Sequence, residues 1–207
     1  MRIFDDRCQK GQKMARVLVV YATCEGQTEK IAKTIAAELK EKGHSVDLKD
    51  AADESDAVHV NVYGGVVVGG PVHYSGYPTS LQRWVKENAK DLSNKPAAFF
   101  SVCLGILHKE NKKDQDDQRK IVFDLFEWSS WFPRQWTIFA GALPYSRYGF
   151  IKRFFMKAMS TSYGTDTDTS RDYDYTSWED VRRFSNAFHV ELMSSIQQRK
   201  PRSSRIG

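Results

Sequence analysis

The stretch Val17-Leu-Val-Val-Tyr-Ala-Thr-Cys-Glu-Gly-Gln-Thr28 decides the fold of this 207-residue chain. A short apolar run, typical of a buried strand, leads into a Thr-x-x-Gly-x-Thr turn, and a helical pattern follows at once. Such a turn directs backbone N–H groups and the positive end of the helix dipole at one point, which stabilises a bound phosphate. Thr23 and Thr28 add hydroxyl donors, and Gly26 lets the backbone approach a ligand closely. The sequence predicts a phosphate site; the alternative is an ordinary helix start with Thr28 as an early polar residue.

The composition of this loop limits the ligand, because residues 23–28 contain no Lys or Arg. The nucleotide-triphosphate loop needs a Lys, and the dinucleotide fingerprint needs Gly-x-Gly-x-x-Gly. We therefore expect one phosphate group held by neutral donors. The loop and its preceding strand resemble the FMN-phosphate loop of flavodoxin-like proteins, which implies FMN as the cofactor. The residues that this resemblance assigns to the cofactor are Thr23, Cys24, Glu25, Gly26, Gln27 and Thr28.

Apolar runs alternate with helical stretches along the chain, as in βαβ winding around a parallel sheet. Strands are expected at 16–21, 46–48, 66–70, 97–102 and 137–142, and helices at 27–42, 78–88, 120–128, 150–159 and 176–196. Residues 53–63 stay ambiguous, since alternating valines there also fit a strand. The last helix opens with a capping-box pattern, Thr176-Ser-Trp-Glu179. Together these elements predict an α/β, flavodoxin-like three-layer fold with strand order 2-1-3-4-5 and a ligand crevice at the strand carboxyl ends.

The domain limits follow from length and composition. The chain suits one domain, residues 15–198, which we expect to be the flavodoxin-like FMN-binding domain. Residues 1–14 mix charges and lack an apolar segment, so a disordered leader is expected, and 199–207 form a loose basic tail. A polar stretch over 104–118 predicts a long insertion after strand 4. Three cysteines without a Cys-x-x-Cys pattern argue against a disulfide framework or a metal site.

Two further loops converge on the predicted crevice, one over 69–76 and one over 101–105. Tyr74 and Tyr77 are expected to wall a planar ring, beside exposed backbone at glycines 69, 70 and 76. His73 is either an acid or base, or a loop histidine that bonds solvent or backbone. Cys103 is expected to be a small buried residue rather than a nucleophilic thiolate, and we assign no catalytic acid or base. The cofactor residues expected from these loops are Pro71, Val72, His73, Tyr74, Ser101, Cys103, Leu104 and Gly105.

The formal net charge of +5 is concentrated in one segment. Residues 128–165 contain no Asp or Glu but five Lys or Arg, interleaved with many aromatic side chains. This combination suits a membrane surface, an anionic aromatic ligand or nucleic acid. Nucleic acid is the weakest of the three, because it leaves the phosphate loop unexplained. The alternative is ordinary core packing of the aromatic residues, which does not explain the missing acids.

The second half of the chain narrows the resemblance. The runs Ala140-Gly-Ala-Leu-Pro-Tyr-Ser-Arg-Tyr148, Thr165-Asp-Thr-Asp-Thr169 and Tyr175-Thr-Ser-Trp-Glu179 flank the basic aromatic segment. With the phosphate loop, they resemble the flavodoxin-like protoporphyrinogen oxidases, the menaquinone-dependent protoporphyrinogen IX dehydrogenases. The similarity covers residues 15–192. The chain departs from the family at His73, where an Arg stands in the relative, and in the composition of the insertion.

The resemblance implies FMN-dependent oxidation of protoporphyrinogen IX to protoporphyrin IX in heme biosynthesis, with a membrane quinone as acceptor. It also implies peripheral contact with the cytoplasmic face of the respiratory membrane, or a mitochondrial location in a eukaryote. We expect the substrate propionates to meet Lys109, Lys112, Lys113, Arg147 and Arg153. For the lysines, a solvated charged loop is the competing interpretation.

Two other functions stay open at this point. A flavodoxin-type electron carrier has the same fold, although carriers of that family are usually acidic near the flavin. An NAD(P)H-dependent quinone reductase would need a nicotinamide platform, and the sequence contains no clear one. Whether the chain forms a homo-oligomer is also left open.

Overall fold

The computed structural model describes residues 14–53, 58–73, 76–107, 112–143 and 172–198. Its centre is a five-stranded sheet in which all neighbouring strands are parallel. The strands are β1 (Arg16–Tyr21), β2 (Ser45–Asp50), β3 (Gly65–Pro71), β4 (Ala97–Val102) and β5 (Gln135–Phe139). Their order, β2-β1-β3-β4-β5, confirms the order predicted from the sequence.

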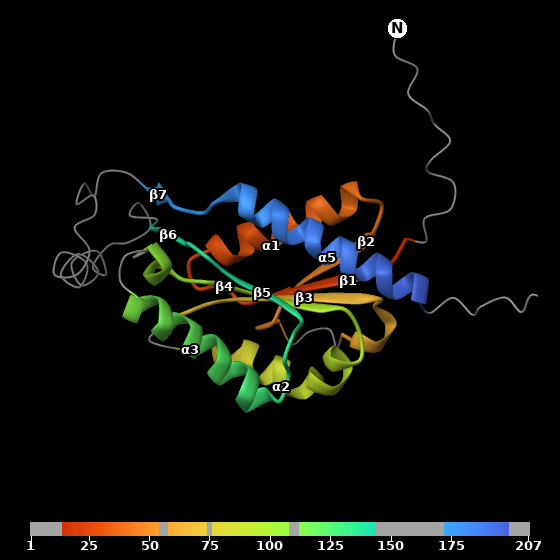
Figure 1. The fold of residues 1–207 in the computed structure, drawn as a ribbon, viewed down its shortest axis with the longest axis horizontal. Helices are drawn as coiled ribbons and strands as arrows, with labels where there is room; N and C mark the ends of the chain where they lie inside the picture. Colours follow the sequence, from red (N-terminus) through yellow and green to blue (C-terminus); the bar gives the residue numbers. More distant parts are fainter. Residues whose placement is uncertain (1–13, 54–57, 74–75, 108–111, 144–171, 199–207) are drawn as a thin grey trace, which may run out of the picture.

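Helices cover both faces of the sheet (Figure 1). They are α1 (Gln27–Glu41), α2 (Thr79–Ser93), α3 (Lys112–Ser129) and α5 (Trp178–Gln198). Figure 1 shows α1 and α5 over one face and α2 and α3 over the other, which confirms three layers. Short 3₁₀ turns, η1 (Val60–Val62) and η2 (Leu104–Leu107), precede β3 and follow β4. A second, two-stranded antiparallel sheet pairs β6 (Ala142–Leu143), which follows β5, with β7 (Tyr173–Asp174).

Two apolar clusters, one on each face, hold the layers together. Ile31, Ile35 and Leu39 recur at helical spacing on α1 and pack with Phe188 of α5. On the opposite face α2 and α3 supply the apolar contacts, and Trp131 is among the largest fully buried side chains. Burying each such side chain contributes about 1.5–3 kcal/mol to stability. The sheet is therefore held between two packed helix layers, and the loops follow the carboxyl ends of its strands.

The glycines of β3 have a packing role that differs from the prediction. A Cβ built at Gly69 would lie 1.9 Å from the ring of Phe100, and one at Gly70 would lie 2.2 Å from Leu81. Both glycines are buried within the strand. The expectation of exposed backbone at these two positions is wrong, because neighbouring side chains fill the space that the missing Cβ leaves.

The connection between β4 and β5 also differs from the prediction. Residues 112–118 are the first turns of α3 and not part of a long polar loop. Lys, Gln and Arg favour the helical state, so a polar composition alone did not distinguish a loop from an exposed helix. The described part of this connection is thus a helical crossover. Residues 144–171, which lie between β6 and β7 in the sequence, are outside the described residues.

Smaller boundary differences complete the comparison. Residues 60–62 form η1 rather than a strand, and β5 begins at Gln135, two residues earlier than expected. The basic aromatic helix predicted at 150–159 lies outside the described residues.

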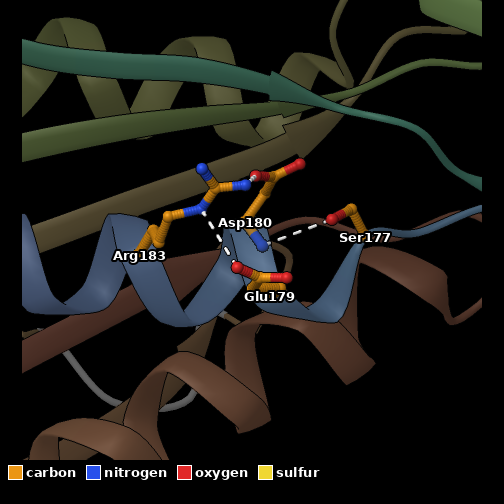
Figure 2. A network of polar contacts seen from close by, with 4 residues as sticks. All are labelled: Ser177, Glu179, Asp180 and Arg183. Carbon is orange, nitrogen blue, oxygen red and sulfur yellow. Dashed lines mark hydrogen bonds and ion pairs between the residues drawn. The ribbon is translucent and has the colours of Figure 1, made fainter.

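The start of α5 shows a cap shifted by one residue from the predicted box (Figure 2). Asp180 N–H donates to Ser177 Oγ at 3.3 Å, so Ser177 caps the helix. The Arg183 side chain pairs with the Asp180 carboxylate, and its Nε lies 4.0 Å from Glu179 Oε1. The hydroxyl of Thr176, the expected cap, donates instead to Ala140 O.

Candidate cofactor site

A cavity of about 270 Å³ lies at the carboxyl ends of β1, β3 and β4. Most of the residues predicted to bind the cofactor surround it. The predicted residues that line the cavity are Thr23, Cys24, Glu25, Gln27, Thr28, Pro71, Val72, His73, Cys103, Leu104 and Gly105. Tyr74 lies outside the described residues. The topology explains this convergence, because parallel strands bring their carboxyl ends to one edge of the sheet.

The phosphate loop is held in shape by the conformation of one glycine and by one hydrogen bond to a side chain. Gly26 adopts a left-handed conformation with φ of 89°, and its N–H donates to Thr23 Oγ1 at 2.9 Å. Gly26 is also the N-cap of α1, and no side chain caps this helix. The first-turn N–H groups of α1 therefore stay available to a ligand at the helix N-terminus.

Thr28 supplies the strongest sign that this loop accommodates an anion. Its side chain is 2% exposed and lines the cavity. Among the described residues, no hydrogen bond engages its hydroxyl. A buried donor without a partner costs about 1–3 kcal/mol, and an oxygen-rich ligand in the cavity removes that cost. The residues present thus fit a phosphate monoester held by neutral donors.

The side chain of Gln27 bonds another part of the chain and not the proposed phosphate. Its Nε2 donates to Asp174 Oδ1 at 3.0 Å and to Thr176 Oγ1 at 2.8 Å. Both amide hydrogens are therefore engaged by the segment around β7. Only the backbone N–H of Gln27 remains to face a phosphate.

The turn after β3 is closed by backbone hydrogen bonds. His73 N–H donates to Gly76 O at 2.8 Å, and Gly76 N–H donates to His73 O at 3.1 Å. The side chain of His73 is exposed at the edge of the cavity.

The expectation that Tyr77 walls a planar ring is wrong. Its side chain is buried and packs edge-on against Phe99, with ring centroids 5.4 Å apart. The Tyr77 hydroxyl donates to Ser101 Oγ at 2.9 Å, and burial raises the pKa of Tyr77. Ser101 itself is fully buried and does not line the cavity. These two side chains bond each other beneath the cavity instead of facing it.

The thiol of Cys103 is held in place by two neighbours. Its Sγ–H donates to Gln118 Oε1 at 2.8 Å, and Gly105 N–H donates to Sγ at 3.3 Å. Burial raises the pKa of the Cys103 thiol, which favours the protonated form. The geometry agrees with a structural thiol rather than a nucleophile.

Sequence reasoning missed four residues that line the cavity. They are Val102, Gln118, Gly141 and Ala142. Gln118 was assigned to a loop, and only its position on α3 brings its amide to the cavity. Gly141 and Ala142 belong to the run from Ala140 to Tyr148, which carried part of the family resemblance. The sequence pattern did not assign that run to the cofactor cavity.

The predicted substrate residues are only partly described. Lys112 and Lys113 are exposed in the first turn of α3, on the same helix as Gln118. Lys109, Arg147 and Arg153 lie outside the described residues. Within the described ranges, no group of three or more His, Cys, Asp or Glu side chains is arranged to hold a metal ion.

Comparison with known proteins now identifies the family. A flavodoxin domain model matches residues 18–170. The chain is 34% identical over 172 residues to the quinone-type protoporphyrinogen IX dehydrogenase of Escherichia coli K12, covering 82% of this chain and 92% of the relative. It is 32% identical over 176 residues to the Leishmania major protein of the same name, covering 84% and 74%.

Among solved structures, oxidised flavodoxin 1 from Bacillus cereus aligns with a TM-score of 0.52 at 15% identity, over 84% of this chain and 97% of that one. A short-chain flavodoxin associated with a bacterial microcompartment aligns with a TM-score of 0.53 at 14% identity, over 88% and 99%. These likenesses support the fold alone. The sequence relatives go further, and the chain belongs to the flavodoxin-like family of quinone-dependent protoporphyrinogen IX dehydrogenases.

Proposed function

We propose that the protein oxidises protoporphyrinogen IX to protoporphyrin IX with FMN as cofactor and a quinone as electron acceptor, in heme biosynthesis. The observation that carries this proposal is the 34% identity to the Escherichia coli dehydrogenase across most of both chains. The cavity at the strand carboxyl ends supports it, since this is where ligands bind in open α/β sheets.

The phosphate loop supports FMN as the cofactor. The uncapped N-terminus of α1, the left-handed Gly26 and the buried hydroxyl of Thr28 together suit one phosphate group. Bound FMN would supply two-electron redox chemistry, and the protein would supply position and electrostatics. Val72, His73 and Leu104 border the remainder of the cavity, where a ring system would lie.

The role of the chain's own residues toward the substrate is positional. Lys112 and Lys113, with Lys109, Arg147 and Arg153, are proposed to bind the two propionates by charge-assisted hydrogen bonds. The protonated Cys103 thiol orients the Gln118 amide and takes no covalent part. We assign proton transfer to no side chain.

The quinone acceptor implies contact with a membrane. Of the helices that the structure describes, none combines the length and apolar character needed to cross a bilayer. We propose peripheral association at the cytoplasmic face of the respiratory membrane, or a mitochondrial location if the source is a eukaryote. The acid-free segment 128–165 is the proposed contact.

An anaerobic assay tests the function directly. Purified protein loaded with FMN is mixed with protoporphyrinogen, and porphyrin fluorescence is followed after a quinone is added. We expect fluorescence to rise only with quinone present, and parallel reactions without protein give the spontaneous rate. Quinone reduction driven by NADH or NADPH, with no porphyrin formed, would contradict the proposal and favour a quinone reductase.

A further inference from the structure

The side chain of Gln27 joins the phosphate loop to the distant end of the chain. Gln27 is the first residue of α1, whereas Asp174 ends β7 and Thr176 follows it. The two hydrogen bonds from Gln27 span sequence separations of 147 and 149 residues. Gln27 and Thr176 are each 7% exposed, so the hydrogen bond between them is shielded from water, whereas Asp174 is exposed.

The donor and acceptor of each hydrogen bond in this network can be assigned. A carboxylate accepts only, so the Gln27 amide nitrogen must face Asp174. Thr176 Oγ1–H donates to Ala140 O at 2.9 Å, which leaves its oxygen to accept from Gln27. Thr176 N–H donates to Asp174 Oδ1 at 3.0 Å and fixes that carboxylate. Each hydrogen bond in this network thus joins a donor to a suitable acceptor.

The network also crosses the site. Ala140 follows β5, and the next two residues, Gly141 and Ala142, line the cavity. The chain of bonds therefore runs from the N-terminus of α1, through Gln27 and Thr176, to the backbone beside the cavity wall. The flavodoxin model matches only residues 18–170, so Asp174 and Thr176 lie beyond the part of the chain that it describes.

We propose that Gln27, Asp174 and Thr176 form a clasp that positions the first turn of α1 to bind the phosphate of FMN. Asp174 and Thr176 are positioning residues: they act on the cofactor through Gln27 and do not touch it. The inference rests on the proposed FMN cofactor. Its distinctive consequence is that the clasp matters for the phosphate and not for the ring system of the flavin.

Riboflavin separates these two contributions, because it has the ring system without the phosphate. Apo-protein is titrated with FMN and with riboflavin, and quenching of flavin fluorescence gives each Kd. We expect Thr176→Val to raise the Kd for FMN about tenfold, since two neutral hydrogen bonds are lost, and to leave the Kd for riboflavin unchanged. Asp174→Ala, at an exposed position, should have the same selective effect with less risk to folding.

Matched controls distinguish positioning from general destabilisation. Thr34→Val removes a threonine hydroxyl bond on α1, the helix that begins with Gln27, to Lys30 O at 3.0 Å, and should leave both Kd values unchanged. Thr176→Ser keeps the hydroxyl and should restore FMN affinity. In a cycle with Gln27→Leu, the double variant with Thr176→Val should be no weaker than either single variant.

The outcomes are separable. Equal weakening of FMN and riboflavin by Thr176→Val and Asp174→Ala, or no change in either, would overturn the clasp. Wild-type protein that binds neither flavin would refute the cofactor proposal itself, and with it the inference. Selective loss of FMN binding, with unchanged riboflavin binding and rescue by serine, supports the clasp.

Discussion

At the scale of single residues, the phosphate loop depends on backbone conformation rather than on charge. Gly26 is left-handed, and its neighbours Thr23 and Thr28 supply one internal acceptor and one hydroxyl without a partner in the described chain. A loop without Lys or Arg selects its ligand by shape and by neutral hydrogen-bond donors. Single substitutions in the loop can therefore test its role.

Gly26→Val should release the cofactor. Valine is strained at φ of 89°, at a cost of about 1–3 kcal/mol, and its side chain crowds the phosphate approach. We expect FMN affinity to fall about tenfold to a hundredfold, measured as flavin content after purification and by fluorescence titration. Thr34→Val serves as a control on the same helix. A variant that keeps wild-type flavin content would show that the loop is not the phosphate site.

The residues of this loop could be placed from the sequence because their geometry is local. A strand, a glycine and a helix start lie within twelve residues, and local sterics fix the turn. Tyr77, Gly69 and Gly70 could not be placed in the same way. Whether Tyr77 faces the cavity depends on Phe99 and Ser101 of another strand, and the two glycines are explained only by the side chains that press on them.

At the scale of elements, the same distinction applies to α3 and α5. Apolar periodicity located α1, α2 and α5, because buried faces leave a regular pattern. The first turns of α3 bury little, so the sequence contained no such pattern and Gln118 was missed as a cavity residue. At the start of α5, both Thr176 and Ser177 suited the N-cap position. The Thr176 hydroxyl bonds Ala140 O, and Ser177 is the residue that caps the helix.

Ser177→Ala tests the cap separately from the site. Loss of the bond to Asp180 N–H should cost about 1 kcal/mol and lower Tm by about 2–4 °C in a domain of this size. Thermal unfolding followed by circular dichroism measures the change. FMN affinity should stay at the wild-type value. A fall in FMN affinity without a fall in Tm would instead assign Ser177 to the site.

A histidine pair joins the start of β2 to α5 and should make stability depend on pH. Ala15 N–H donates to His44 Nδ1 at 3.3 Å, so His44 carries its proton on Nε2, 2.8 Å from His189 Nδ1. Burial first, then His189 and Lys42, lowers the pKa of His44; burial and Lys42 lower the pKa of His189. These lowered pKa values favour the neutral form of both rings in the folded protein.

The sign of the effect follows from these lowered pKa values. Below the ordinary histidine pKa of about 6.5, the unfolded chain binds more protons at these two residues than the folded protein does. The free energy of unfolding therefore falls as pH falls. Above that value the contribution of the pair is constant. Urea unfolding between pH 5 and 8 measures this, and His189→Asn should flatten the acidic limb. An equally steep limb in that variant would mean that other groups cause the loss.

At the scale of the whole molecule, the cations proposed to bind the substrate propionates should govern substrate affinity. Replacing Lys109, Lys112 and Lys113 together by Ala, or Arg147 by Ala, should raise KM for protoporphyrinogen. A charge-assisted contact contributes about 1.5–3 kcal/mol, so kcat/KM should fall about ten- to a hundredfold, with FMN content unchanged. Wild-type kcat/KM in both variants at physiological salt would place propionate binding elsewhere.

The uneven charge along the chain predicts reversible binding to membranes. Residues 128–165 carry five cations and no acids. Each cation near an anionic surface contributes about 1 kcal/mol, screened over a Debye length of about 8 Å at physiological salt. Sedimentation with vesicles should therefore show binding to anionic lipid that weakens with added salt. Equal binding to neutral vesicles would remove the electrostatic basis.

The long sequence separation between Gln27 and Thr176 has a consequence for biosynthesis. A nascent chain completes β1, the turn and α1 early, and every strand of the main sheet is synthesised before residue 176 leaves the ribosome. The phosphate loop is thus synthesised early, whereas Thr176, the hydrogen-bond partner of Gln27, follows about 149 residues later. The proposed clasp therefore predicts that tight FMN binding requires a chain synthesised past residue 176. A chain released earlier would lack both this tie and α5, which packs on one face of the sheet.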